Sequence, residues 1–327
     1  MINQTHMRHE IEEIPAVVAG FLEKSADVVA EAAAVLRDRQ PPVVATIARG
    51  SSDHAAAYLK YAIELTLGLP VASIGPSVAS IYGAPLKLDR AVAIAISQSG
   101  KSPDIVGMAR AAREGGATAI AITNTAGSPI AEAADFTIDL HAGVEQSVAA
   151  TKTFVTSVVA GLTLLSRWAE DAALAAAVAA LPDAFSRAIA CDWSGLVDAL
   201  DGHDALYVLG RGPGWAIANE AALKFKETCG IQGESYSSAE VMHGPVSIVT
   251  PGYPVLALAA RDAAEASVAD MAHSLAEKGA KAFVTSDRPG AAARLPADYA
   301  RRYDLRRVGE GFSRDDVAFV AARRRPL

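Results

Sequence analysis

The stretch from Ala91 to Ser102 constrains the fold most, because an uninterrupted apolar run ends abruptly in small polar residues. Ala91–Ile96 contains only Ala, Val and Ile, which is typical of a parallel strand buried on both faces. A polar loop, Ser97–Ser102, follows it, and a helical pattern then runs from Ile105 to Glu114. This order predicts an anion site, since unpaired backbone N–H groups and the positive end of the helix dipole converge at the loop.

The side chains of this loop favour a phosphate ester as the anion. Ser97, Ser99 and Ser102 carry hydroxyls and Gln98 carries an amide, and each can donate a hydrogen bond to a phosphate oxygen. The alternative is that the serines only cap the following helix, which is a common role for serine at such a turn. The loop by itself leaves both interpretations open.

Apolar runs alternate with helical patterns through the first half of the chain. Helical periodicity covers residues 7–38, and Pro15 is expected to begin a second helix there. Short strands are then predicted at Val43–Ile47, Val71–Ile74, Ala91–Ile96, Thr118–Ile122 and Phe136–Leu140, with helices that include Ala55–Leu67 and Ile105–Glu114. This alternation predicts an α/β fold with a parallel sheet, in which ligands bind at the carboxyl ends of the strands. The turn Gly50-Ser51-Ser52 would lie at the same edge as the 97–102 loop.

The second half of the chain repeats the first at an offset of roughly 160 residues. Ala205–Gly214 has the shape of Val43–Ser52, with Arg211-Gly212 at the place of Arg49-Gly50. Further matches at the same offset are Pro254–Ala259 with Ala91–Ile96, Glu265–Lys278 with Ile105–Glu114, and Lys278-Gly279-Ala280 with Gly115-Gly116-Ala117. An offset that holds through several elements indicates two copies of one α/β unit.

The two copies differ in their polar residues. Residues 259–264 replace the serine-rich loop with Ala-Ala-Arg-Asp-Ala-Ala, so only the first copy is expected to bind phosphate. The second copy instead carries Glu220, Lys224 and Glu227 at a spacing that places them along one helix face, and His243 before a Gly-Pro turn. A solvated charged face and a structural histidine are the plain alternatives to a catalytic role for these four residues.

Composition and cysteine content narrow the function classes. The net charge of −7 argues against a nucleic-acid or membrane-surface binder, which needs clustered basic residues. Two cysteines and no signal-peptide pattern favour the cytoplasm. No close histidine or cysteine spacing indicates a metal, and no cofactor is expected.

Domain limits follow from these patterns. A long helix is expected over Ser147–Ala169, and an alanine-rich helix from Asp171 to about Ala190. We therefore expect an N-terminal helical segment at 1–40, a first domain at 41–192 and a second domain at 193–327.

Five motifs together resemble the isomerase half of glucosamine-6-phosphate synthase, which is a pair of sugar isomerase (SIS) domains. In chain order they are Gly50-Ser51-Ser52, Ser97-Gln98-Ser99-Gly100, Val148–Lys152, Glu220–Glu227 and Glu240-x-x-His243-Gly244-Pro245. The resemblance covers residues 7–290. It implies two tandem SIS domains, each with a mainly parallel, doubly wound, flavodoxin-like five-stranded sheet. No counterpart of the synthase's amino-terminal glutaminase is expected, because no cysteine follows Met1.

The resemblance also implies roles for individual residues. Ser97, Gln98, Ser99 and Ser102 would bind phosphate, Ser52, Val148 and Ala150 would line the sugar, and Ser51 would support the loop. Glu227 would move a proton between C2 and C1, His243 would assist ring opening, and Lys224 and Glu220 would position or polarise the open-chain sugar. In the family this histidine reaches the active site of a neighbouring subunit, which implies a homodimer with shared active sites.

The sequence departs from the family pattern at three places. Lys101 stands where the synthase usually has an acid, and Ala150 replaces a common hydroxyl residue. The family closes its site with a tail lysine that forms an imine with the sugar, but the last lysine here is Lys281 and residues 303–327 do not look like that tail. No Schiff-base residue is therefore assigned.

Proteins with two SIS domains and no glutaminase resemble the second type of glucosamine-6-phosphate deaminase. The expected reaction converts glucosamine 6-phosphate to fructose 6-phosphate and ammonia, with glutamate as the base and histidine as a proton-transfer group. The alternatives are a fructosamine-6-phosphate deglycase, a synthase-type isomerase that uses ammonia, and a sugar-phosphate-binding regulatory protein without catalysis. The expected ligand is glucosamine 6-phosphate or fructose 6-phosphate.

Overall fold

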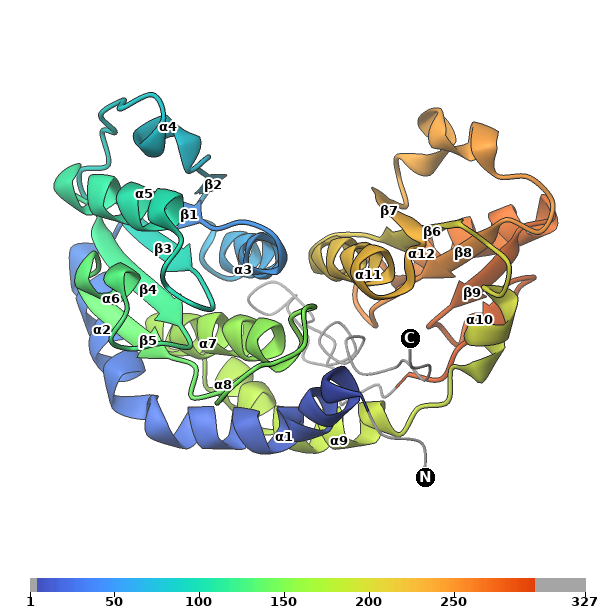
Figure 1. Cartoon of the computed structure of the whole chain (residues 1–327), viewed down its shortest axis with the longest axis horizontal. Coiled ribbons are helices and arrows are strands. Elements are labelled where there is room, and N and C mark those ends of the chain that lie inside the picture. Colours follow the sequence, from blue (N-terminus) through green and yellow to red (C-terminus); the bar gives the residue numbers. More distant parts are fainter. Residues whose placement is uncertain (1–4, 298–327) are drawn as a thin grey trace. The chain divides into compact units, whose positions relative to one another are not determined.

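The chain forms two parallel five-stranded sheets in a computed structural model that describes residues 5–297 (Figure 1). Residues 13–145 and 152–182 cluster into one compact unit, here called the first-sheet unit. Residues 5–12, 146–151 and 183–297 form the second-sheet unit. This division falls at Pro182–Asp183, whereas the domain limit expected at 192–193 stays a prediction. The expected tail at 303–327 lies outside the described residues.

The first sheet has the strand order β2-β1-β3-β4-β5, with all neighbours parallel. This is the doubly wound, flavodoxin-like order that the resemblance to SIS domains implies, and its parallel strands are those that the alternating pattern predicts. The strands are β1 (Val44–Ile47), β2 (Val71–Ser73), β3 (Val92–Ile96), β4 (Thr118–Thr123) and β5 (Phe136–Asp139). The helices before and between them are α1 (His6–Lys24), α2 (Ala26–Arg39), α3 (Ser51–Leu67), α4 (Ser77–Ser80), α5 (Pro103–Glu114) and α6 (Pro129–Glu132).

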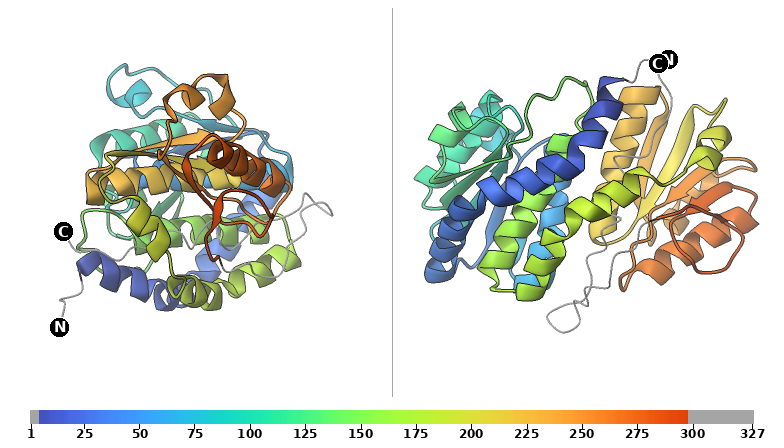
Figure 2. Two further views of the ribbon diagram at one scale, coloured as in Figure 1. Left: turned by 90° about the vertical axis from the view of Figure 1, so that its right-hand side faces the viewer. Right: turned by 90° about the horizontal axis from the view of Figure 1, so that it is seen from below.

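Side-chain alternation along the strands divides the core of this unit into two layers. Ala45, Ala93 and Ala95 face α5 and α6, while Val92 and Ile94 point to the opposite face. That opposite face is covered by α3 and α7 (Lys152–Trp168), and α2 lies alongside α7 (Figures 1 and 2). Two shorter helices follow, α8 (Ala172–Ala179) and α9 (Leu181–Ile189). Small side chains on the α5 face allow this helix to pack closely on the sheet.

The second sheet has the order β10-β9-β8-β6-β7, which is the same topology read from the other edge. Its strands, all parallel, are β6 (Ala205–Gly210), β7 (Gln232–Ser237), β8 (Pro254–Ala257), β9 (Lys281–Val284) and β10 (Ala293–Arg294). Its other elements are α10 (Ser194–Ala199), α11 (Pro213–Cys229), α12 (Glu265–Glu277) and the 3₁₀ helices η1 (Val241–His243) and η2 (Pro245–Ile248). The internal duplication and the fold class are therefore confirmed.

The duplication extends to backbone dihedral angles. Gly50 (φ 58°, ψ −139°) precedes α3, and Gly212 (φ 59°, ψ −134°) precedes α11. Both helices contain 17 residues, and they end at left-handed glycines, Gly68 and Gly230. Positive φ at these positions favours glycine in each copy, because side chains with a Cβ rarely adopt it.

Three expected helix limits are wrong, each for a physical reason. Pro15 lies inside α1 and does not begin a helix, because the buried stripe that includes Ile11, Ile14 and Val18 continues across it. The chain instead breaks at Ser25, whose hydroxyl donates to the Asp139 carbonyl oxygen at 2.8 Å.

The other two limits concern α7 and the alanine-rich region. The helix expected from Ser147 begins only at Lys152, where the Glu145 carboxylate accepts from the Thr153 N–H and so caps the first turn. The alanine-rich helix is divided in two, since Pro182 has no N–H for the Val178 carbonyl oxygen and its ring would clash with that carbonyl in a continuous helix.

Candidate functional site

The turn after β1 forms the first predicted hydroxyl-rich segment. Ser51 and Ser52 lie in the first turn of α3, and both are partly buried. The Gly50 carbonyl oxygen accepts from the N–H groups of Asp53 (2.9 Å) and His54 (3.1 Å). Burial raises the pKa of Asp53, and the neighbouring His54 opposes this shift. The two hydroxyls therefore stand at the start of a helix, where the positive end of the helix dipole favours an anion.

The second segment, Ser97–Ser102, folds back on itself after β3. The buried Ser97 hydroxyl accepts from the Gly100 N–H at 3.2 Å, and the Ser99 hydroxyl accepts from the Lys101 N–H at 3.4 Å. The Gln98 carbonyl oxygen accepts from the Asn124 N–H at 3.0 Å, which ties the loop to the end of β4. Main-chain contacts thus fix the loop and leave the Gln98 side chain partly exposed.

Gly100 is required for this loop geometry. Its φ is 63°, and a Cβ built on it would lie 2.0 Å from the Ser128 hydroxyl oxygen and 2.9 Å from a methyl carbon of Ile130. The Ser128 hydroxyl is buried without a hydrogen-bond partner among residues 5–297. Any side chain at position 100 would push the loop away from Ser128.

Ser102 bears directly on the capping alternative. It occupies the N-cap position of α5 with extended backbone angles (φ −63°, ψ 114°), yet its side chain makes no capping hydrogen bond. A serine present only as a cap would bond an N–H of the first turn. The phosphate role of this loop stays a prediction, but capping does not account for the Ser102 hydroxyl.

The predicted charged face of α11 is a buried ion-pair group. The Lys224 Nζ lies 3.0 Å from Glu220 Oε1 and 2.7 Å from Glu227 Oε2. The Glu220 side chain is fully buried, that of Lys224 is 9% exposed and that of Glu227 is 32% exposed. Lys224 therefore balances the charge of the buried Glu220 carboxylate and also orients the more exposed Glu227 carboxylate. Loss of one partner of a buried pair typically costs about 3–5 kcal/mol of stability.

The first copy holds uncharged residues at the three positions equivalent to Glu220, Lys224 and Glu227. Gly50 and Gly212 are 162 positions apart (212 minus 50), and this offset places Glu220, Lys224 and Glu227 at the positions of Tyr58, Ala62 and Leu65 in α3. Tyr58 and Ala62 are fully buried in that helix. The fold therefore accepts uncharged residues at all three positions, so the buried charges of α11 are not required for folding.

His243 lies on a separate turn of the second-sheet unit. It ends η1 and is exposed, and Gly244 after it has a φ of 143°. The Tyr207 hydroxyl donates to the Pro245 carbonyl oxygen at 2.8 Å, and Val241 is fully buried, so this turn is anchored on both sides of the histidine. Burial and the nearby Glu234 carboxylate raise the pKa of Tyr207, which therefore stays a neutral donor.

Val148 and Ala150 lie in the segment before α7. Val148 is 96% exposed, and Ala150 is partly buried. This segment and the α11 group belong to the second-sheet unit, whereas both hydroxyl-rich turns belong to the first-sheet unit. Within the second-sheet unit, Glu220, Lys224 and Glu227 of α11 are in direct contact.

Sequence reasoning missed the residues that hold these segments in place. Glu10, Glu145, Asn124 and Tyr207 all bond to the backbone of predicted site segments or next to them. Of these four residues, only Glu10 could have been singled out from the sequence. It adjoins Ile11 and Ile14 on the apolar stripe of α1, where an acidic residue is unusual.

One cavity of about 880 Å³ lies in the first-sheet unit, and none of the predicted site residues lines it. It is lined by the segment 79–86 and by α5 residues that include Asp104, Arg110 and Glu114. Among residues 5–297, no cluster of three or more His, Cys, Asp or Glu is arranged to hold a metal ion. In the same residues, no single helix is long and apolar enough to cross a membrane, and only the bent pair α8–α9, taken together, meets that criterion.

The chain is similar to known proteins along most of its length. Residues 39–167 and 200–302 match the SIS domain family model. A glutamine–fructose-6-phosphate aminotransferase (isomerizing) from Symbiobacterium thermophilum is 37% identical over 243 residues, which cover 70% of this chain and 39% of that protein. A corresponding enzyme from Aeropyrum pernix is 34% identical over 255 residues, 74% of this chain and 40% of that protein. The chain thus spans about two fifths of the length of these two relatives.

Solved structures agree with this assignment. A Silicibacter pomeroyi DSS-3 protein, proposed to be a phosphosugar isomerase, has a TM-score of 0.91 and 54% identity, with 98% of this chain and 95% of that chain covered. The C-terminal domain of glucosamine-fructose-6-phosphate aminotransferase from Francisella tularensis has a TM-score of 0.83 at 23% identity, covering 98% and 93% of the two chains, and shares the fold. With two matched segments that coincide with its two sheets, this chain belongs to the SIS domain family.

Proposed function

We propose that this chain is a phosphosugar isomerase that acts on an aminosugar phosphate, with Glu227 as the base. The observation that carries the proposal is the buried group Glu220–Lys224–Glu227, which replaces uncharged residues of the equivalent helix α3. The phosphosugar assignment is further supported by the names of the relatives, which are fructose-6-phosphate aminotransferases and a proposed phosphosugar isomerase.

The proposed reaction begins with open-chain glucosamine 6-phosphate. His243 assists ring opening, and Glu227 removes the C2 proton. The electron pair of the broken C2–H bond forms a C1–C2 double bond while the C1 oxygen takes up a proton. Return of the proton from Glu227 to C1, with the nitrogen lone pair forming a C2–N double bond and the nitrogen releasing a proton, gives a C2 imine. Water hydrolyses this imine to ammonia and fructose 6-phosphate.

Each residue has a role that suits its environment. Lys224 holds the Glu227 carboxylate at 2.7 Å, and Glu220 balances the lysine charge from the buried side. In the first-sheet unit, Ser97, Gln98, Ser99 and Ser102 bind the phosphate. Ser51 and Ser52 support that loop and the sugar. Val148 and Ala150 contact the sugar, and a homodimer that shares its active sites remains part of the proposal.

The decisive experiment gives glucosamine 6-phosphate to the purified chain in deuterated buffer. Ammonia release, fructose 6-phosphate formation and deuterium at C1 or C2 are measured together. Glu227→Gln is expected to lower turnover by about 10²–10⁴-fold, the usual contribution of a general base. Glu277→Gln, the same change at an exposed position of α12, is the matched control and should leave turnover unchanged.

The substrate panel separates the alternatives. Release of amine only from fructosamine 6-phosphate adducts would indicate the deglycase, and synthesis of glucosamine 6-phosphate from fructose 6-phosphate and ammonia would indicate the synthase-type isomerase. Binding of these sugars without turnover or deuterium exchange would contradict an enzymatic role and indicate a sugar-phosphate sensor.

A further inference from the structure

The segment from Gln146 to Thr151 has an unusual anchor, which none of the proposed catalytic roles uses. It contains Val148, whose side chain is 96% exposed, and lies immediately before the first residue of α7. An exposed valine in a non-helical segment has no packing that would fix its position. Its place therefore depends on the backbone contacts of the segment.

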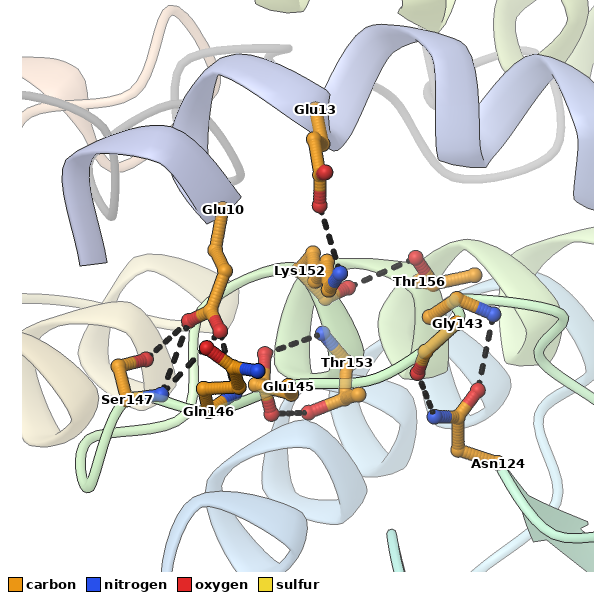
Figure 3. Close-up of polar contacts among 11 residues, drawn as sticks. Glu10, Glu13, Asn124, Gly143, Glu145, Gln146, Ser147, Lys152, Thr153 and Thr156 are labelled. Carbon is orange, nitrogen blue, oxygen red and sulfur yellow. Dashed lines mark hydrogen bonds and ion pairs between the residues drawn. The ribbon is translucent and has the colours of Figure 1, made fainter. Parts of the chain in front are cut away.

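Glu10 supplies those contacts from α1 (Figure 3). Its carboxylate accepts from the N–H groups of Gln146 and Ser147, the latter at 3.1 Å, and from the Ser147 hydroxyl. The same hydroxyl lies 2.9 Å from the Ala149 carbonyl oxygen. Glu10 is only 4% exposed, and all these residues belong to the second-sheet unit. One buried carboxylate thus accepts hydrogen bonds from two consecutive N–H groups and from a hydroxyl.

The negative charge of Glu10 strengthens these contacts. Two of the partners are N–H groups, which can only donate, and the Ser147 hydroxyl can donate or accept. Gln has the same size and keeps one oxygen, but it lacks the charge, and hydrogen bonds to a charged acceptor are roughly twice as strong as neutral ones.

Two neighbouring contacts serve a different purpose. Glu145 accepts from the Thr153 N–H at 3.1 Å and from its hydroxyl, and Glu13 pairs with Lys152 at 2.6 Å (Figure 3). Both lie in the first-sheet unit and fix the first turn of α7. These contacts reach Lys152 and Thr153, whereas those of Glu10 reach Gln146 and Ser147.

We propose that Glu10 is a positioning residue that holds the 146–149 backbone so that Val148 and Ala150 contact the sugar of the substrate. The inference rests on the proposed function for the identity of that substrate. Glu10 touches no reacting atom in this role, so its loss affects substrate affinity more than the chemical step.

The test is Glu10→Gln in the full chain, with glucosamine 6-phosphate as substrate. We expect KM to rise about tenfold with kcat within about threefold of wild type, because misplaced contact groups weaken binding. Ser147→Ala removes only the hydroxyl contact and should give a smaller rise in KM, and Glu10→Asp should recover part of the affinity. Glu12→Gln is the matched control, since Glu12 is two residues away on the same helix, is 37% exposed and pairs with Arg8; its KM should be that of wild type.

Hydrogen exchange gives a readout that does not depend on catalysis. The amides of residues 146–149 should exchange faster in Glu10→Gln than in Glu12→Gln, while the unfolding midpoints stay equal. Faster exchange with an unchanged KM would overturn the inference, and so would unchanged exchange.

If the wild-type chain turns over no phosphosugar, the proposed function is wrong, but the positioning role of Glu10 can still be tested. The inference is then judged by the Kd for fructose 6-phosphate, and equal values for wild type and Glu10→Gln would overturn it.

Discussion

Asp262 stands in the second copy where the 162-residue offset places Gly100 of the first. Its carboxylate accepts from the Ala264 N–H at 2.7 Å. Burial is the main cause that raises its pKa above the ordinary value of 3.8, and the nearby Glu265 contributes in the same direction. The same loop position thus holds glycine in the serine-rich copy and a buried acid in the other, and the acid would repel phosphate.

The pKa of Asp262 predicts how Asp262→Asn changes stability with pH. A raised folded-state pKa means that this group favours the folded state below about pH 3.8 and loses that contribution as pH rises through the folded pKa. Asn keeps an oxygen acceptor for Ala264 without the charge. We therefore expect a higher unfolding midpoint than wild type at pH 7 and equal midpoints at pH 3.5, measured by thermal unfolding.

The control for this prediction is Asp270→Asn. Asp270 is exposed on α12 and lies 3.5 Å from Arg288. Loss of that surface pair should leave the midpoint at pH 7 unchanged or slightly lower. A gain equal to that of Asp262→Asn would show that burial is not the cause.

At the scale of elements, α7 packs on α3 so closely that only glycine fits at the crossing. A Cβ at Gly161 would lie 2.2 Å from a methyl carbon of Leu59, whose side chain is fully buried. Nearly every residue of α7 is buried, so the helix has little room to shift.

Two opposing effects decide the result of Gly161→Ala. Ala improves helix propensity by about 1 kcal/mol, while overpacking a core typically costs about 1–3 kcal/mol. Because three atoms of one buried side chain are contacted, we expect a net loss of about 1 kcal/mol in urea denaturation. Gly20→Ala in α1, where a Cβ meets nothing within 4 Å, should instead stabilise by up to about 1 kcal/mol. Equal stabilisation by both changes would contradict the packing argument.

For the whole molecule, the duplication separates residues that the fold needs from residues that bind. Both sheets have one topology, and both first helices begin after glycines of the same conformation. The second copy folds with Arg261 and Ala264 at the positions of Ser99 and Ser102. Neither serine is therefore needed to form a strand-loop-helix unit.

We accordingly expect the double change Ser99→Ala, Ser102→Ala to weaken binding without destabilising the chain. A hydrogen bond to a charged group contributes about 1.5–3 kcal/mol, so the Kd for fructose 6-phosphate should rise at least about tenfold per serine. Calorimetric titration measures this rise, and the free energy of unfolding should change by less than about 0.5 kcal/mol. A loss of stability without a loss of affinity would favour the capping role instead.

Local pattern alone determined the strand positions of the first sheet and those of β6 and β8 in the second, together with the parallel α/β class and the internal repeat. Runs such as Val92–Ile96 and Ala119–Ile122 are apolar at every residue, and a parallel strand buried on both faces produces that pattern directly. The hydroxyl-rich loop and the spacing of Glu220, Lys224 and Glu227 were visible for the same reason, because they are fixed by residues close in sequence.

Tertiary structure decided what depends on contacts between distant residues. Glu10 bonds to Gln146 across 136 positions, in the segment where the sequence predicts the start of a helix. Helix α1 continues across Pro15 because Ile11 and Ile14 are buried by packing. Contacts between distant residues also decide which carboxylates are buried and paired. A carboxylate is buried only where the folded chain supplies hydrogen-bond donors to it, and the local sequence pattern does not show where those donors will lie.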